Sequence, residues 1–259
     1  MLVGLDGGAA REDIPRTVGQ ALEAYARERL ADPPPGQEQG IQVALEVLTA
    51  FFQDEHAELV SGSAAGRRPG TGTLGLPSRC LLRGLHASVH LFPYSCVVSA
   101  AVIGRFAAEV RSLASWSAQV GLCGSRELAR FRRGFRQAMD PMRRHRRMQD
   151  SIEDACAPYV AAAQSAMVQG RFLVEAVDAL GVRVTVPGRG EAYRVRMPRP
   201  VREAFCAGQA VSLAMFERAM GWNPVGMSLP ADPDWLEDHC AQLEKLRWPW
   251  PPRPLPEAF

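Results

Sequence analysis

Lysine is nearly missing from this sequence: among its 30 basic residues only Lys245 is a lysine, and all the others are arginines. Such one-sided use of arginine, in a chain that is also rich in alanine, glycine and proline, is typical of a GC-rich genome. The overall composition therefore does not point to phosphate recognition. Information about function has to come from where the arginines lie along the chain.

Long apolar runs and closely spaced cysteines are missing too. The longest apolar candidate, 96–103, is about half as long as the roughly 18–20 residues that cross a bilayer. The opening "MLVGLDGGAAREDIP" has acidic residues where a signal peptide has basic ones. The six cysteines lie at least sixteen residues apart, which suits reduced and mostly buried thiols. These features predict a cytoplasmic protein without a membrane span or a disulfide framework.

Catalytic motifs are also missing. The sequence has no G-x-S-x-G, H-E-x-x-H or Walker lysine. Gly70, Gly72 and Gly75 form a literal G-x-G-x-x-G, but Pro69 and Pro77 flank it where a nucleotide site needs a strand and a helix. We therefore predict a non-catalytic protein without a cofactor. An active site assembled from residues far apart in the sequence is the open alternative.

One cluster contains the residue types that bind zinc. Cys80, His86, His90 and Cys96 are spaced symmetrically, and the two histidines would share one face of a helix. Zinc needs four converging ligands, and this cluster has neither a C-x-x-C pair nor a second close ligand pair. We predict no metal.

Arginine is concentrated in two segments. The first, Arg126–Arg147, holds nine arginines and two acidic residues, for a net charge of +7. The second, Arg183–Arg202, holds six arginines and one acidic residue, for a net charge of +5. Since the whole chain carries only +2, the remainder sums to −10. Such polarity along a sequence indicates a polyanionic partner or an acidic protein surface.

The first segment predicts an amphipathic basic helix over 126–149. Arg126, Arg130 and Arg133 recur at i, i+4 and i+7, while Phe131 and Phe135 fall on another face. Such a face can neutralise successive phosphates. The alternative is a solvated helix whose charge is balanced by the acidic residues between 148 and 182. The candidate contacts on this helix are Arg126, Arg130, Arg133, Arg136, Arg143, Arg144, Arg146 and Arg147.

The second segment predicts a basic β-hairpin over 182–197. Apolar and polar residues alternate on both sides of a Pro-Gly-Arg-Gly turn, which places Arg183, Arg194 and Arg196 on one face. A two-stranded basic ribbon can follow a nucleic-acid groove. We expect these three arginines to extend the positive surface of the basic helix.

The segment before the hairpin resembles the order of a winged helix. We expect a helix from Ser151 to about Gln169 and a second over Arg171–Leu180, followed by the hairpin as a wing. However, Glu175 and Asp178 lie on the polar side of this second helix, and carboxylates facing phosphates repel them. A standard winged helix is therefore disfavoured.

The chain divides into four parts. We expect an N-terminal helix pair over 1–60, a Gly/Ser/Pro-rich linker over 61–78, a helical body over 79–247 and an extended proline-rich arm over 248–259. The first helix of the pair should start near Asp13, and the second should run to about Leu59. The fold class is α+β and mainly α: a helical body with one β-hairpin and a proline-rich C-terminal arm.

Further helices are expected inside the body. They cover 95–122, the arginine segment with an interruption near Asp140-Pro141, about Pro200–Met220, and a short stretch capped by Asp234. The small residues of 95–122 indicate a buried helix. Its predicted core residues are Val97, Val98, Val102, Ile103, Phe106, Val110 and Leu113.

Two functions fit these patterns. The first is a DNA- or RNA-binding protein, either a regulator or a subunit of a nucleoprotein complex, that contacts the phosphate backbone through the basic helix and the basic hairpin. The second is a helical adaptor that binds an acidic protein surface, with the arm at 248–259 docking elsewhere. The exposure of the arginines distinguishes the two functions. An uncovered arginine surface favours the first function, and acidic segments that cover the arginines favour the second.

Overall fold

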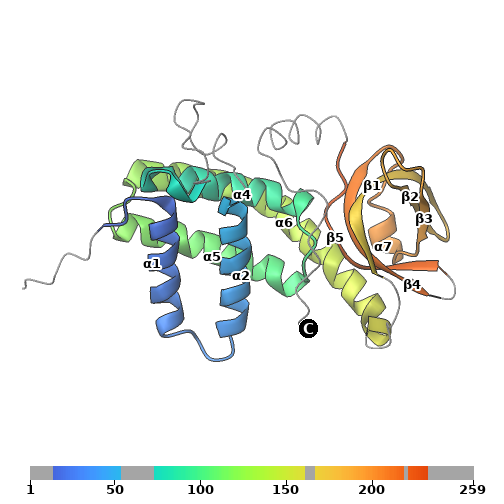
Figure 1. Cartoon of the computed structure of the whole chain (residues 1–259), viewed down its shortest axis with the longest axis horizontal. Helices are drawn as coiled ribbons and strands as arrows, with labels where there is room; N and C mark the ends of the chain where they lie inside the picture. Colours follow the sequence, from blue (N-terminus) through green and yellow to red (C-terminus); the bar gives the residue numbers. More distant parts are fainter. Residues whose placement is uncertain (1–13, 54–72, 161–166, 219–220, 233–259) are drawn as a thin grey trace, which may run out of the picture.

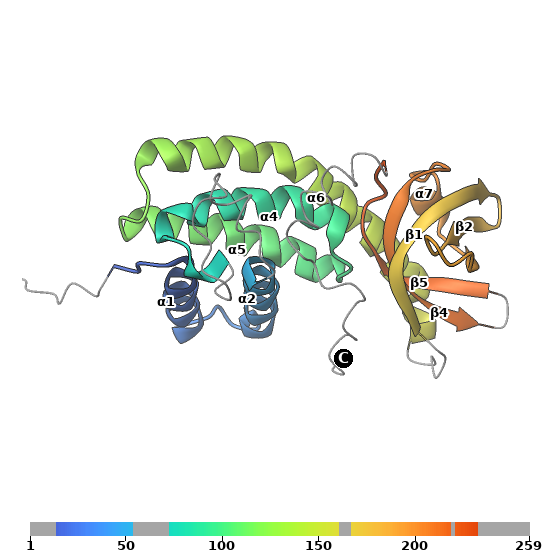
Figure 2. The same cartoon turned by 45° about the horizontal axis from the view of Figure 1, so that its top comes forward.

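The computed structural model describes residues 14–53, 73–160, 167–218 and 221–232. It has a helical part at one end and a β-barrel at the other, and one long helix reaches from the first into the second (Figures 1 and 2). This mixed architecture confirms the α+β class. The arm at 248–259, the short helix at Asp234 and most of the predicted linker lie outside the described residues.

The helical part is built from five helices among the described residues. Figure 1 shows α1 and α2 side by side, running across the lengthwise α4, α5 and α6. Within the described residues, no helix is both long and apolar enough to cross a membrane. The bounds are Val18–Ala31 for α1, Glu38–Gln53 for α2, Leu81–Ser95 for α4, Ala100–Gln119 for α5 and Ser125–Val160 for α6.

Side-chain caps fix where the helices start. Thr17 accepts a hydrogen bond from the backbone N–H of Gln20, whose side chain in turn accepts one from the backbone N–H of Thr17. This reciprocal capping box starts α1 five residues after the predicted Asp13. At α5 the Ser99 side chain accepts a hydrogen bond from the N–H of Val102, without a reciprocal bond.

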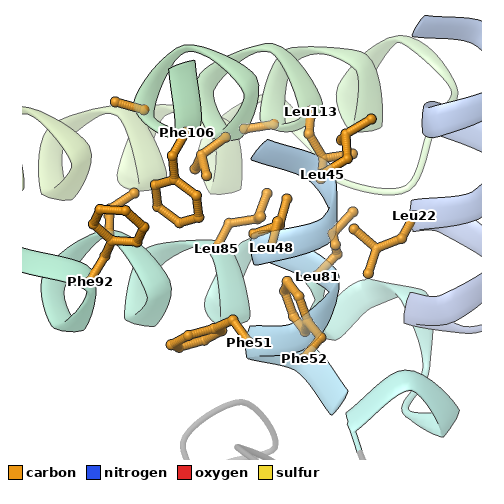
Figure 3. Close-up of a cluster of buried hydrophobic side chains, with 14 of the residues drawn as sticks. Leu22, Leu45, Leu48, Phe51, Phe52, Leu81, Leu85, Phe92, Phe106 and Leu113 are labelled. Carbon is orange, nitrogen blue, oxygen red and sulfur yellow. The ribbon is translucent and has the colours of Figure 1, made fainter. Parts of the chain in front are cut away.

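The core of the helical part lies between α2, α4 and α5. Leu48, Leu85 and Phe106 meet there from the three helices (Figure 3), and the Phe92 and Phe106 rings stack at 4.1 Å. Burying one such side chain contributes about 1.5–3 kcal/mol. Of the core residues predicted on the helix over 95–122, Ile103, Phe106, Val110 and Leu113 of α5 are buried and Val102 is partly buried. Val97 and Val98, also partly buried, precede α5, because the helix starts at Ala100 and not at 95.

The predicted break at Asp140-Pro141 is wrong, because α6 is continuous over 36 residues. A proline inside a helix removes one backbone hydrogen bond, but buried Ala138, Met142 and His145 on either side hold this helix against its neighbours. The predicted new start at Ser151 is wrong for a related reason. The Ser151 hydroxyl donates back to the carbonyl of Arg147 inside the same helix, so it does not act as a cap.

The C-terminal part is a closed five-stranded barrel with the strand order β1-β2-β3-β5-β4. Neighbouring strands are antiparallel except β3 and β5, which are parallel. A short helix, α7 (Arg199–Arg202), stands between β3 and β4. This connectivity is that of the OB-fold. The strands are β1 (Met167–Asp178), β2 (Gly181–Thr185), β3 (Ala192–Val195), β4 (Ala210–Arg218) and β5 (Gly221–Met227).

The predicted hairpin is present as β2 and β3, although it is one part of a larger sheet. Val182 pairs with Val195 inside the barrel, and Arg183 pairs with Arg194 outside it. Two predicted helices are wrong. Residues 171–178 belong to β1, with Phe172 and Val174 pointing inward, and 179–180 form the turn after it. Most of 200–220 forms α7 and β4.

The long helix α6 joins the two parts through polar contacts. His145 donates from Nε2 to the carbonyl of Met227 at 2.7 Å. Gln149 accepts from the N–H of Met227 at 3.2 Å and donates to the carbonyl of Val225 at 3.0 Å. Because both side chains are buried and bind the backbone of β5, the barrel is held in a fixed position on the helix.

Candidate functional site

All nine arginines between Arg126 and Arg147 are exposed on α6. The helix buries the opposite side, where Phe131, Phe135 and Met142 pack against α4 and α5. The apolar spacing therefore fixes which face is turned inward, and the arginines occupy the rest. The predicted helix with an apolar and a basic face is thus present.

Few of these arginines have an acidic partner among the described residues. Arg143 pairs with Asp140 at 2.9 Å, and Arg146 pairs with Asp150 at 3.9 Å. Both pairs are at least half exposed, so water screens them and they contribute little to stability. The acidic residues after position 148 do not balance the charge of the helix, because among those described only Asp150 reaches an arginine of the cluster.

The hairpin arginines are in a different electrostatic setting. Arg183 pairs with Glu175 at 2.8 Å and Arg194 with Asp178 at 2.5 Å, and both acids come from the neighbouring β1. The backbone N–H of Leu180 and, to a smaller extent, the Arg194 guanidinium lower the pKa of Asp178, so this carboxylate is charged at neutral pH. Arg196 is exposed and forms no ion pair with a described residue.

The two predicted basic elements do not adjoin. Figures 1 and 2 place β2 and β3 on the far side of the barrel, while the first half of α6 lies in the helical part. Arg126, Arg130 and Arg133 therefore belong to one surface, and Arg183, Arg194 and Arg196 belong to another.

A groove of about 1020 Å³ runs between α5 and α6. We call it the α5–α6 groove. Six arginines and one glutamate line it: Arg29, Arg105, Arg111, Arg132, Arg136, Arg143 and Glu109. Its remaining lining is mostly small or apolar and includes Ala108, Ser112, Ser115, Leu128, Phe131, Phe135 and Met139.

Glu109 anchors one wall of this groove. Its carboxylate accepts from the Tyr25 hydroxyl at 2.7 Å and from Arg29 at 3.1 and 3.2 Å, and Arg105 lies 3.7 Å away. Burial raises the pKa of Tyr25, and the neighbouring Glu109 raises it further, so the phenol keeps its proton. Arg29, Arg105 and Arg111 are not among the residues predicted from the sequence, although the Arg105–Glu109 spacing of i, i+4 is a signal for a local ion pair.

The metal candidate does not assemble into a site among the described residues, and the nucleotide candidate lies mostly outside them. His86 and His90 lie with their Nε2 atoms 3.2 Å apart, and burial lowers the pKa of His86. No group of three or more histidine, cysteine or carboxylate side chains in the described ranges is arranged to hold a metal ion. Gly75 ends a short 3₁₀ helix, and Gly70 and Gly72 lie outside the described residues.

Comparisons with known proteins provide no relative for this chain. No protein-family model matches it, no curated protein is significantly similar to its sequence, and no solved structure matches its fold significantly. Function therefore has to be argued from the charge and shape of the surfaces described above.

Proposed function

We propose that the protein binds the phosphate backbone of a nucleic acid through five arginines of α6. They are exposed, lie outside the α5–α6 groove, and form no ion pair with a described residue. We call them the outer arginine stripe: Arg126, Arg130, Arg133, Arg144 and Arg147. This uncovered charge is the observation that carries the proposal.

The stripe has the dimensions for several phosphate contacts. Residues 126 and 147 are separated by about 30 Å along a helix, at roughly 1.5 Å per residue. Guanidinium groups offer paired N–H donors that match phosphate oxygens. Contacts to phosphate do not depend on base sequence, so we propose binding with little sequence preference.

The barrel supports this proposal less strongly than α6 does. OB-folds commonly bind oligonucleotides across strands β2 and β3, but Arg183 and Arg194 on those strands are already paired with Glu175 and Asp178. A nucleic acid would have to displace these acids or tolerate them. We therefore assign the hairpin a minor share of the binding.

A salt titration tests the proposal. The full chain is titrated against labelled duplex DNA, single-stranded DNA and RNA by fluorescence anisotropy at several salt concentrations. The logarithm of the affinity should fall by roughly 0.7–0.9 per phosphate neutralised for each decade of salt. The stripe variant combines Arg126→Gln, Arg130→Gln and Arg133→Gln. It should bind all sequences more weakly, and its salt slope should be shallower by about two to three.

The matched control removes the same charge from the hairpin. This hairpin variant combines Arg183→Gln, Arg194→Gln and Arg196→Gln. It should reduce the salt slope by less than the stripe variant does, because Arg183 and Arg194 are already neutralised by acidic partners. Absence of binding at low salt, or an unchanged slope in the stripe variant, would reject nucleic-acid binding by α6.

A further inference from the structure

The α5–α6 groove combines charge with an apolar floor. Leu128, Phe131, Phe135 and Met139 lie along the same side of α6, and Ala108 lies opposite them on α5. Above this floor stand Arg111, Arg132 and Arg136, which form no ion pair with a described residue. A molecule that binds this groove must therefore both cover the apolar floor and neutralise the three arginines.

The α5 side of the groove is lined by small residues. Ala108, Ser112 and Ser115 recur at i, i+4 and i+7 on α5, and each is partly buried. Small side chains let the backbone of a neighbouring segment come close. Together with the volume of about 1020 Å³, they leave room for a row of apolar side chains from an occupant.

The floor argues against a nucleic acid as this occupant. Single strands bind by stacking their bases on exposed aromatic rings, but Phe131 and Phe135 are only 4% and 8% exposed. Rings that are buried to this extent offer no stacking platform. Phosphates would meet the arginines and leave the apolar floor uncovered.

We propose that the α5–α6 groove is a docking site for an acidic amphipathic helix of a protein partner. Its apolar stripe covers Leu128, Met139 and the edges of the two phenylalanines, and its carboxylates pair with Arg111, Arg132 and Arg136. Helices bind grooves through apolar residues at i, i+3, i+4 and i+7. Charge at the groove rim then selects the partner and its orientation.

This proposal does not depend on nucleic-acid binding. The outer arginine stripe and the groove share no residue, so either surface can function without the other. A protein with both surfaces would connect a nucleic acid to an acidic protein.

A synthetic peptide tests the groove on the full chain. The probe is a fluorescein-labelled helix of about 18 residues, roughly five turns, with leucines on one face and glutamates beside them. A scrambled peptide of the same composition keeps the charge and loses the apolar stripe. We expect the amphipathic peptide to bind at least about ten-fold tighter than the scrambled one.

Two variants and one control locate the binding. Replacing Arg111, Arg132 and Arg136 by Gln should remove most of the affinity, whereas the stripe variant at Arg126, Arg130 and Arg133 should retain it despite an equal loss of charge. Ala108→Phe should block the groove without changing charge, and a melting curve by circular dichroism checks that each variant is folded.

Three results would overturn the groove proposal. They are equal affinity for both peptides, unchanged affinity in the groove variants, or oligonucleotide binding that is lost in the groove variants and kept in the stripe variant. Because the peptide readout is independent of oligonucleotides, a failure here is distinguishable from a failure of nucleic-acid binding by α6.

Discussion

The arginines of α6 and those of the hairpin are alike in the sequence and different in the structure. On α6 the outer arginine stripe faces water without acidic partners among the described residues, whereas Arg183 and Arg194 lie against Glu175 and Asp178 of β1. The cause is geometric. A solitary helix face meets few other side chains, but a strand within a barrel has neighbours on both sides. Local charge density therefore predicts an available cation surface well for a helix and poorly for a strand.

The largest effect should come from removing the support of the α6 face. Ile103 is 1% exposed in the core that α5 forms with its neighbours. Ile103→Asp places an unpaired carboxylate there, which costs several kcal/mol. We expect loss of cooperative melting in the helical part, measured by circular dichroism. A soluble variant with a nearly unchanged midpoint would contradict the assignment of this core, and Ile103→Val is the mild control, at about 1 kcal/mol.

A smaller effect should appear at the joint between the two regions. Burial lowers the pKa of His145 to about 4, and the unfolded chain has an ordinary histidine pKa of about 6.5. The unfolded state therefore binds a proton first as pH falls. The contribution of neutral His145 to the free energy of unfolding is fully present above pH 6.5. About 3 kcal/mol of this free energy is lost between pH 6.5 and pH 4.

Chemical denaturation over this pH range measures the effect. His145→Gln keeps a donor for the carbonyl of Met227 and cannot titrate, so the difference in unfolding free energy between wild type and variant should change with pH. Parallel pH profiles for the two proteins would show that His145 does not control the acid sensitivity of the joint.

The smallest effect should come from removing the acidic partners of the hairpin arginines. A double variant with Glu175→Gln and Asp178→Asn releases Arg183 and Arg194 from their acidic partners. The hairpin arginines then lack acidic partners among the described residues, as the outer arginine stripe of α6 does. If nucleic acid binds this protein, we expect the affinity to rise and the salt slope to become steeper by up to about two, one for each cation released. The anisotropy titration measures both. An unchanged slope would mean that the hairpin lies outside the binding surface even when its charge is free.

The sequence was sufficient for features that depend on local spacing. The helical period predicted α1, α2 and α5, and alternation around Pro-Gly-Arg-Gly predicted the β2–β3 pairing. The exposed arginine face of α6 followed from the spacing of Phe131 and Phe135. Each of these features needs only residues within one or two elements.

Features that depend on distant residues could not be predicted in this way. The segment "RFLVEAVDAL" contains good helix formers, and only pairing with β2 and β4 makes its first eight residues a strand. In "AVSLAMFER" the nearly continuous apolar run hides the strand period, because both sides of β4 are largely buried. The α5–α6 groove likewise depends on Arg29, which reaches Glu109 from 80 residues away in the chain.

The continuity of α6 has a mechanical consequence. One uninterrupted helix carries Arg126, Arg130 and Arg133 near its start and binds β5 through His145 and Gln149 in its second half. Each residue of such a rod advances about 1.5 Å and turns about 100°. The number of residues between Arg133 and His145 thus sets how far Arg126, Arg130 and Arg133 stand from the barrel and in which direction they point. One residue added within this span would turn these three arginines by more than a quarter of a circle relative to the barrel and would separate their face from that of Arg144 and Arg147.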